Sequence, residues 1–413
     1  MKSSTFFIFA LVIMSYQSEA AVSLKESFHS AMTNMESIKR AKAVVNQSLE
    51  LKNEARAAIL PTISGVGTYT KIDPPSAAGA SPFLLTKQYS GAIRLNQPLF
   101  RGGLFSAYQF AKENVLLAKY QEDATAVNLY QLVINAYYSL AVAQTDVKNV
   151  AELLGYSKER VGEIRERTKI GRSRKGELVE AEAQLHIAES QYQQVLLNLQ
   201  QAEKTFEFYT RIKPDKLVIP SRLPELAGPV GEYMMKVKNR PDIKANLQQV
   251  NLADQQISIA KGSHYPQLDL TGNYYLDRTG VLETSEWDVG VAVVIPIYQG
   301  GAVEAQVRQA AEGKRIAQLT SSEAQRAAER DVAINYQNLL QIKEQLKSLR
   351  EALKKSEQVY KLNKKDYQYG LVTNLDVLQS LNVFIETKRS YDNLISIGHL
   401  NYKNLDALTG VLP

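Results

Sequence analysis

The most regular hydrophobic pattern of the chain lies in residues 178–209. Apolar side chains recur there at steps of three and four for more than four heptads, which predicts a helix with a coiled-coil seam. The seam positions are Leu178, Ala181, Leu185, Ala188, Tyr192, Val195, Leu199, Ala202, Phe206 and Tyr209. Adding 199 to each number gives a second seam in register, from Val377 to Leu408, with weaker apolar character. Two equivalent helices are therefore expected.

Proline placement extends this prediction to most of the chain. Residues 99–213 and 297–412 contain no proline, and both stretches are rich in Ala, Leu, Gln, Glu and Lys, which favour helices. A helix from Leu104 to Ile170 would have 67 residues and a length of about 100 Å. Residues 214–241 hold five prolines instead, which indicates a connector at 214–240. The chain then divides into a first repeat, 21–213, and a second repeat, 241–413.

Four other segments alternate apolar and polar residues, which is typical of β-strands. They are residues 62–72, 87–97, 267–278 and 285–295. Each has about 11 residues, the length that crosses a bilayer when a strand is tilted. In the last segment, Asp288 and Gly290 are expected to face a lumen, and the opposite row is expected to face lipid. This row is Trp287, Val289, Val291, Val293 and Ile295.

The strand count predicts an oligomer. Four strands cannot close a barrel, and an open sheet edge is costly in lipid because its backbone groups stay unpaired. Several copies are therefore expected to assemble with cyclic symmetry around a pore.

One short motif occurs once in each repeat. Residues 95–103 read LNQPLFRGG and residues 293–301 read VVIPIYQGG. Proline cannot donate to a sheet ladder, and paired glycines permit a sharp change of direction. The motif therefore predicts two corners at which a strand leaves the sheet and a long helix begins. The corner residues are Pro98, Gly102 and Gly103 in the first repeat, and Pro296, Gly300 and Gly301 in the second.

Composition limits the possible chemistry. Lys2, the apolar run 6–14 and the small residues Ser18 and Ala20 predict a signal peptide at 1–20. The chain has no cysteine, and a net charge of +6 over 413 residues does not indicate nucleic-acid binding. No phosphate-binding motif or nucleophile constellation is present, and the histidines show no short ligand spacing. These are His29, His186, His264 and His399. We therefore expect no metal site, no cofactor and no enzymatic activity.

The duplicated order of elements, the P-[LI]-[FY]-x-G-G corners and the closing LDALTG at 405–410 resemble the TolC-like outer-membrane efflux channels. The resemblance covers nearly all of the mature chain. It implies an α+β membrane protein that forms a homotrimer, with two β-hairpins per chain contributing to a twelve-stranded barrel in outer-membrane lipid. Long antiparallel coiled-coil helices would form an α-barrel through the periplasm.

The resemblance also implies partners and a passive role. The partners would be a periplasmic adaptor (membrane fusion) protein and an inner-membrane efflux pump or ABC transporter, which supplies the energy. Two alternatives stay open at this point. One is the outlet of a type I protein secretion system, which uses the same architecture. The other is a soluble periplasmic coiled-coil adaptor, which would lack the alternating hairpins.

The resemblance suggests a pore constriction at the helical tips near Gly171 and Gly370. The family has two carboxylates one helical turn apart at the second tip, and these positions fall here on Asp376 and Gln379, so one ring would be neutral. The equivalent positions of the first tip hold Glu177 and Glu180. Each carboxylate could instead stabilise the start of its helix through the helix dipole.

The adaptor-contact pattern of the family is approximately Val-Gly-Leu at each tip. Tyr369, Gly370 and Leu371 fit it roughly, whereas Ile170, Gly171 and Arg172 depart from it. The first tip is also basic, with Arg165, Arg167, Lys169, Arg172, Arg174 and Lys175. We therefore expect that the first tip either docks no adaptor or docks a more acidic one.

Overall fold

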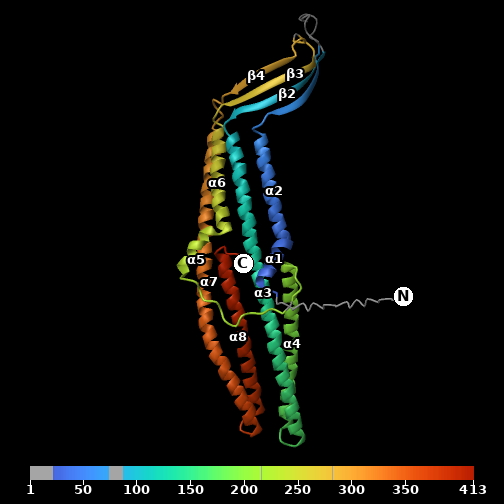
Figure 1. The fold of residues 1–413 in the computed structure, drawn as a ribbon, viewed down its shortest axis with the longest axis vertical. Helices are drawn as coiled ribbons and strands as arrows, with labels where there is room; N and C mark the ends of the chain where they lie inside the picture. The colour runs from blue at the N-terminus through green and yellow to red at the C-terminus, as the bar shows by residue number, and fades with distance from the viewer. Residues whose placement is uncertain (1–21, 74–86, 215, 281) are drawn as a thin grey trace, which may run out of the picture.

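The computed structural model describes residues 22–73, 87–214, 216–280 and 282–413. The predicted signal peptide and the loop residues 74–86 lie outside these ranges. Long helices run along the main axis of the molecule, with a sheet at one end and two helical tips at the other (Figure 1). In the described ranges, no helix combines the length and the apolar character that a membrane crossing requires.

The two halves of the chain repeat the same order of elements. The first half contains α2 (Glu36–Ala57), β1 (Thr62–Lys71), β2 (Lys87–Arg101), α3 (Leu104–Lys169) and α4 (Lys175–Thr210). The second half contains α6 (Pro241–Gly262), β3 (Gln267–Arg278), β4 (Trp287–Val294), α7 (Ala302–Gln368) and α8 (Asn374–Leu408). The short helices α1 (Leu24–Asn34), α5 (Val230–Lys236) and η1 (Val237–Asn239) lie near mid-length (Figure 1). The predicted helices and strands are thus present.

Four helices pack side by side in each of two successive segments along the long axis. Between the sheet and mid-length, α2, α3, α6 and α7 lie in this order, and beyond it α4 and α8 pack on α3 and α7 (Figure 1). All ten seam positions of α4 are buried or half-buried, as are all ten equivalent positions of α8. The coiled-coil prediction is therefore confirmed, including the weaker second seam.

The main core lies at mid-length, where α1, α3 and α4 meet. Tyr130, Ile134 and Phe206 are almost completely buried there. The ring of Phe28 on α1 lies 4.9 Å from the ring of Tyr130, measured between centroids. Burying such a side chain stabilises a fold by about 1.5–3 kcal/mol. This core therefore fixes the point from which the two helical hairpins extend toward the tips.

The four strands form one antiparallel sheet in the order β1-β2-β3-β4. One row across it joins Ser64, Arg94, Asn273 and Asp288, and hydrogen bonds connect the last three of these polar side chains. Arg94 Nε donates to Asn273 Oδ1 at 2.8 Å, and Asn273 Nδ2 donates to Asp288 Oδ1 at 2.8 Å. The next row is mostly apolar and joins Ile63, Leu95, Gly272 and Val289. The sheet therefore has one polar and one apolar face.

The corners differ in part from the prediction. β2 does not end at Pro98 but continues to Arg101, with a register shift between Pro98 and Phe100 that accommodates a residue without an N–H. At the second corner, Gly300 and Gly301 have φ of 63° and 81°, which favours glycine, and β4 ends before Pro296.

The glycines of the first corner have a different role. Gly102 and Gly103 are not among the residues with positive φ. A Cβ at Gly102 would lie 2.8 Å from the Tyr265 Cβ, and one at Gly103 would lie 3.2 Å from the Ile259 carbonyl oxygen. These glycines therefore allow the corner to approach the end of α6.

Candidate functional site

The two helical tips have the same backbone conformation. Gly171 and Gly370 follow α3 and α7 with φ of 74° and 76°. The Arg172 N–H donates to the Arg167 carbonyl at 2.8 Å, and the Leu371 N–H donates to the Asp366 carbonyl at 3.0 Å. This is the Schellman arrangement, in which a left-handed glycine ends a helix and satisfies its last carbonyls. The tips therefore differ only in what their side chains present.

Asp376 belongs to a capping box at the start of α8. Its Oδ2 accepts hydrogen bonds from the Thr373 N–H at 2.8 Å and from the Thr373 hydroxyl at 2.6 Å. In return, the Asp376 N–H donates to Thr373 Oγ1 at 3.3 Å. The hydroxyl bond and then the backbone bond hold the pKa of Asp376 below its usual range. The helix-start role considered for this residue therefore has direct geometric support.

Asp376 is nevertheless open to solvent. Its side chain is exposed, and so is that of Gln379 one turn further along α8. Both residues line a shallow pocket between α7 and α8 together with Asn363. The capping bonds and an exposed charge are compatible, because the carboxylate is held at Oδ2 without being covered.

Glu177 and Glu180 contact the other helical hairpin. The Glu177 carboxylate accepts hydrogen bonds from the Ser173 hydroxyl and, at 3.1 Å, from the Tyr367 hydroxyl on α7. The Ser173 bond is the main cause that lowers the pKa of Glu177. Glu180 accepts from Asn374 Nδ2 at 3.3 Å. Both first-tip carboxylates therefore lie half-buried between the hairpins, unlike Asp376.

Tyr367 is the centre of these contacts between the tips. The guanidinium carbons of Arg160 and Arg167 lie 3.8 and 4.6 Å from the centroid of its ring. Arg160 also donates from Nε to Asn374 Oδ1 at 3.0 Å. The sequence analysis did not single out Tyr367, Arg160 or Asn374. Their polar contacts join positions about 200 residues apart, which a local pattern does not reveal.

Polar pairs continue this contact between α3 and α8 toward mid-length. Arg389 Nε lies 3.2 Å from Asp146 Oδ1, and Asn149 Nδ2 donates to Asp392 Oδ2 at 2.9 Å. Lys388 pairs with Glu152. These groups are half-buried or buried, so the two hairpins are held together by directional contacts as well as by apolar packing.

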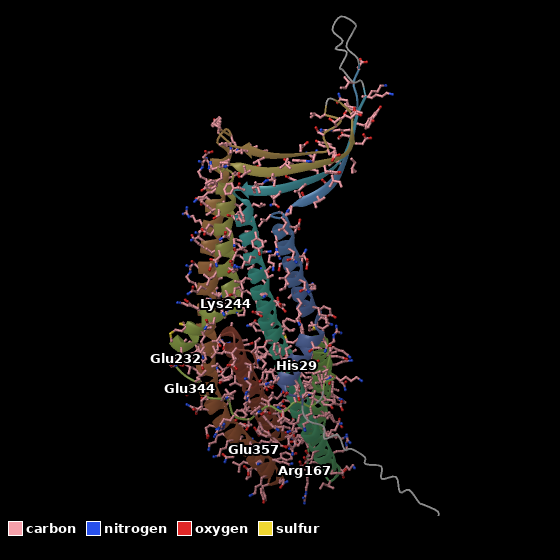
Figure 2. All side chains as sticks on the ribbon, turned by 45° about the horizontal axis from the view of Figure 1, so that its top comes forward. His29, Arg167, Glu232, Lys244, Glu344 and Glu357 are labelled. Carbon is pink, nitrogen blue, oxygen red and sulfur yellow. The ribbon has the colours of Figure 1, made fainter. Side chains whose placement is uncertain are left out.

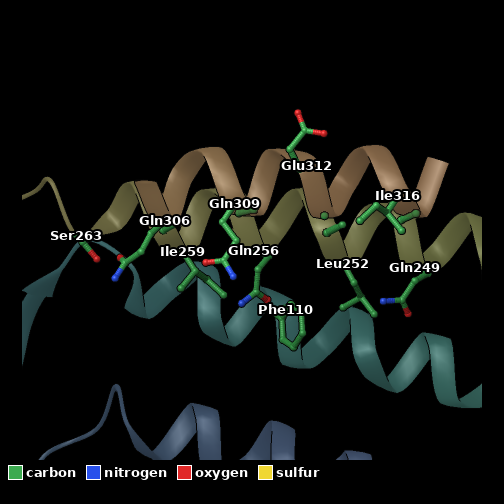
Figure 3. A pocket seen from close by; sticks show the side chains of 15 residues that line it. Phe110, Gln249, Leu252, Gln256, Ile259, Ser263, Gln306, Gln309, Glu312 and Ile316 are labelled. Atoms are coloured by element: carbon green, nitrogen blue, oxygen red, sulfur yellow. The ribbon is translucent and has the colours of Figure 1, made fainter. Parts of the chain in front are cut away.

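A large groove lies nearer the sheet, between α3, α6 and α7 (Figure 3). It has a volume of about 810 Å³, and its lining consists mainly of apolar and amide side chains such as Phe110, Leu252 and Gln309. Glu312 points away from it (Figure 3). The described residues contain no group of three or more His, Cys, Asp or Glu side chains arranged to hold a metal. The groove therefore offers contacts but no acid–base pair.

The family described as outer membrane efflux protein matches residues 28–210 and 235–410. The chain belongs to this family. BepC of Brucella suis biovar 1, an outer membrane efflux protein, is 29% identical over 232 residues, which are 53% of this chain and 50% of BepC. TolC of Escherichia coli K12 is 22% identical over 426 residues, covering 95% of this chain and 83% of TolC. The match thus spans half of BepC and most of TolC.

Solved channel structures share the fold of this outer membrane efflux protein. A CusC structure has a TM-score of 0.85 at 18% identity and covers 94% of this chain and 92% of CusC. The Campylobacter jejuni CmeC outer membrane channel has a TM-score of 0.83 at 17% identity, and the match covers 99% of this chain and 93% of CmeC. The TolC-like resemblance and the fold class are confirmed. The protein is an outer membrane component of an efflux system, and the alternative of a soluble adaptor is set aside.

Proposed function

We propose that three copies of the chain form the exit duct of a tripartite export system. The open four-stranded sheet carries this proposal. The apolar residues on one of its faces are largely exposed in the single chain, with Trp287 at 66%, Val289 at 63% and Val291 at 57%. The outer edges of β1 and β4 have no partner strand among the described residues. Such a sheet needs both lipid and further strands.

Three copies satisfy both needs. Three sheets of four strands give twelve strands, which exceeds the roughly eight required to close a barrel around an interior. The 66 residues of α3 then extend about 100 Å away from the membrane. The paired hairpins would form a helical tunnel whose mouth is the ring of tips. A periplasmic adaptor and an inner-membrane pump or ABC transporter would meet the duct there and supply the energy.

Small molecules are the proposed cargo. Two Pseudomonas putida relatives, each 24% identical over 341 residues, are named as outer membrane proteins of a toluene efflux pump and of an antibiotic efflux pump. A protein-secretion outlet would use the same duct. The class of inner-membrane transporter that purifies with this protein would distinguish the two, because the energy source has to match the cargo.

The oligomer is testable with the mature protein in detergent. Native mass measurement should give three copies, and the same preparation should form ion-conducting channels in planar bilayers. A barrel closed by strands from three chains requires both results together. A stable monomer that inserts and conducts would refute the proposal.

Asp376→Asn should reduce the cation preference of the channel and weaken its block by trivalent cations. Three exposed carboxylates around a narrow mouth would place like charges close together, where low-dielectric walls strengthen their field. Single-channel recording at low salt measures both effects, since 1 M salt would screen them. Glu180→Gln is the control and should change less, because Glu180 already bonds Asn374.

The pH dependence of this preference follows from the capping box. Hydrogen bonds hold the pKa of Asp376 below its usual range, so the carboxylate stays charged as the pH falls. Cation preference should therefore be lost at a lower pH than it would be without these two hydrogen bonds. If Asp376→Asn leaves selectivity and block unchanged, Asp376 only stabilises the helix start.

A further inference from the structure

The two tips carry very different charges despite their common backbone. Residues 165–175 include six basic residues and one acidic residue, a net charge of 6 − 1 = +5. The equivalent window of the second tip, residues 364–374, includes two basic residues and one acidic residue, a net charge of 2 − 1 = +1. Arg167 marks the first tip at the end of the molecule opposite the sheet (Figure 2). The excess charge is therefore concentrated at one tip.

Part of this charge is neutralised within the chain. Arg165 pairs with Glu182 at 2.9 Å and Lys169 pairs with Glu166 at 2.7 Å. Arg167 lies over the ring of Tyr367. Arg165 and Lys169 are therefore partly neutralised, and Arg167 packs against the other hairpin.

The loop and the first turn of α4 hold the uncommitted charges. Arg172 and Lys175 are exposed and have no ion pair within the described ranges. Arg174 lies 3.6 Å from Glu177, but its side chain is 83% exposed, so this pair is weak. Three cationic side chains of each chain are thus available to a partner.

Some of these cationic side chains line a cleft between the two tips. It has a volume of about 490 Å³. The first tip lines it with Arg167, Arg172, Arg174 and Glu177, and the second tip with Tyr367, Leu371 and Asp376. Both carboxylates already accept hydrogen bonds within the chain, Glu177 from Tyr367 and Asp376 from Thr373. The buried Nε of Arg167 has no hydrogen-bond acceptor in the structure. Large apolar side chains are exposed at the same end of the molecule, namely Ile170 at 66%, Tyr369 at 68% and Leu371 at 74%. The tips therefore offer a partner both hydrogen-bond donors and exposed apolar surface.

We propose that the first tip recognises its protein partner through acidic side chains that enter this cleft. The guanidinium groups of Arg172 and Arg174 match the planar geometry of a carboxylate and can bind it with two hydrogen bonds. Ile170, Tyr369 and Leu371 make the apolar part of the contact. This inference rests on the proposed function, because it specifies the chemistry of the adaptor that meets the tips. The partner surface therefore carries Asp or Glu residues beside apolar ones.

Position and shape favour a protein over a lipid surface. The tip is about 100 Å from the sheet and hence from the proposed outer membrane. Arg172 and Arg174 line a cleft rather than a flat face. Three tips around one axis would add their fields and steer an acidic partner toward the mouth, with an association rate that falls as salt rises.

The test uses the assembled protein in detergent and a synthetic amphipathic peptide with four Glu residues beside Leu and Ile. A peptide with Gln at the four positions is its control, and fluorescence anisotropy measures both. The Glu peptide should bind more tightly than the Gln peptide at low salt, and the difference should shrink at high salt. Replacing Arg172, Arg174 and Lys175 together by Gln should weaken Glu-peptide binding by about tenfold.

A charge-matched variant tests whether position matters. Replacing the exposed Lys347, Lys354 and Lys355 of α7 by Gln removes the same charge and should leave binding unchanged. Equal binding of both peptides, or equal loss in both triple variants, would overturn the proposal. Binding to vesicles with phosphatidylglycerol but not to the Glu peptide would overturn it as well. Should the first triple variant not assemble, Arg172→Glu is used instead and should shift preference to a Lys peptide.

The two proposals fail in different ways. The cleft is formed within one chain, so a monomer that binds the Glu peptide would refute the trimeric duct and retain the docking chemistry. A conducting trimer that binds the Glu and Gln peptides equally would support the trimeric duct and refute the docking chemistry.

Discussion

Val291→Arg should prevent most of the protein from assembling in a membrane. Val291 lies at the centre of β4, on the face shared with Val289, Leu270 and Leu268, and it is 57% exposed in the single chain. An arginine on the lipid face of a barrel costs about 2–4 kcal/mol near the midplane. Each trimer would carry this cost three times, so the loss of folded trimer should be nearly complete.

Gly290→Arg is the matched control on the neighbouring residue. Gly290 pairs with Thr271 on the polar face, and a Cβ there would meet no atom within 4 Å. The side chain would therefore extend into the proposed lumen and should allow assembly. The fraction of heat-stable trimer in outer membranes measures both variants. Normal assembly of Val291→Arg together with failure of Gly290→Arg would show that the faces are reversed.

Which residues of β4 share a face could be predicted, because side chains alternate between the two faces of a strand with a period of two. The sheet bears this out for Trp287, Val289 and Val291, which lie in rows with Tyr274, Gly272 and Leu270. The long helices were equally predictable, since a seam such as Ala181 to Phe206 repeats regularly without help from distant residues. Local patterns of this kind carry most of the fold.

The contacts of the tips could not be predicted in the same way. Glu177 and Asp376 occupy starts of equivalent helices, yet one carboxylate meets Tyr367 of the other hairpin and the other caps its own helix. The second tip has Thr373 at the N-cap position where the first has Arg174, so only Asp376 completes a capping box. The contact of Glu177 with Tyr367 depends on how the hairpins pack. Duplication therefore predicts the backbone of a site better than its chemistry.

The corner glycines show a further limit of prediction from the sequence repeat. The Gly-Gly motif predicted one reason for both corners, but only Gly300 and Gly301 have positive φ. The first corner depends on Gly262, which stands at the end of α6 without any motif around it. Adding 205 aligns Ala57 of α2 with this glycine, so the repeat itself gives no sign that glycine is needed there.

Gly262→Ala should therefore destabilise the protein strongly for so small a change. Gly262 is buried, and an added Cβ would lie 2.7 Å from the Gly102 carbonyl carbon and closer still to the backbone of Gly103. Both opposing groups are backbone, so no side-chain rotation can relieve the contact, and the end of α6 must move away from the corner. Overpacking typically costs about 1–3 kcal/mol, and a contact without a flexible partner belongs at the upper end.

The same Gly→Ala substitution inside α3 should raise the stability of the protein instead of lowering it. Gly162 lies inside α3 with no atom within 4 Å of an added Cβ, so Gly162→Ala should stabilise the helix by about 0.5–1 kcal/mol. Thermal unfolding of both variants in detergent, followed by the loss of trimer, gives the comparison. Because α6 leads directly into β3, displacement at Gly262 should also lower the fraction of conducting channels. Equal unfolding temperatures for Gly262→Ala and the unmodified protein would mean that the corner does not depend on this close approach.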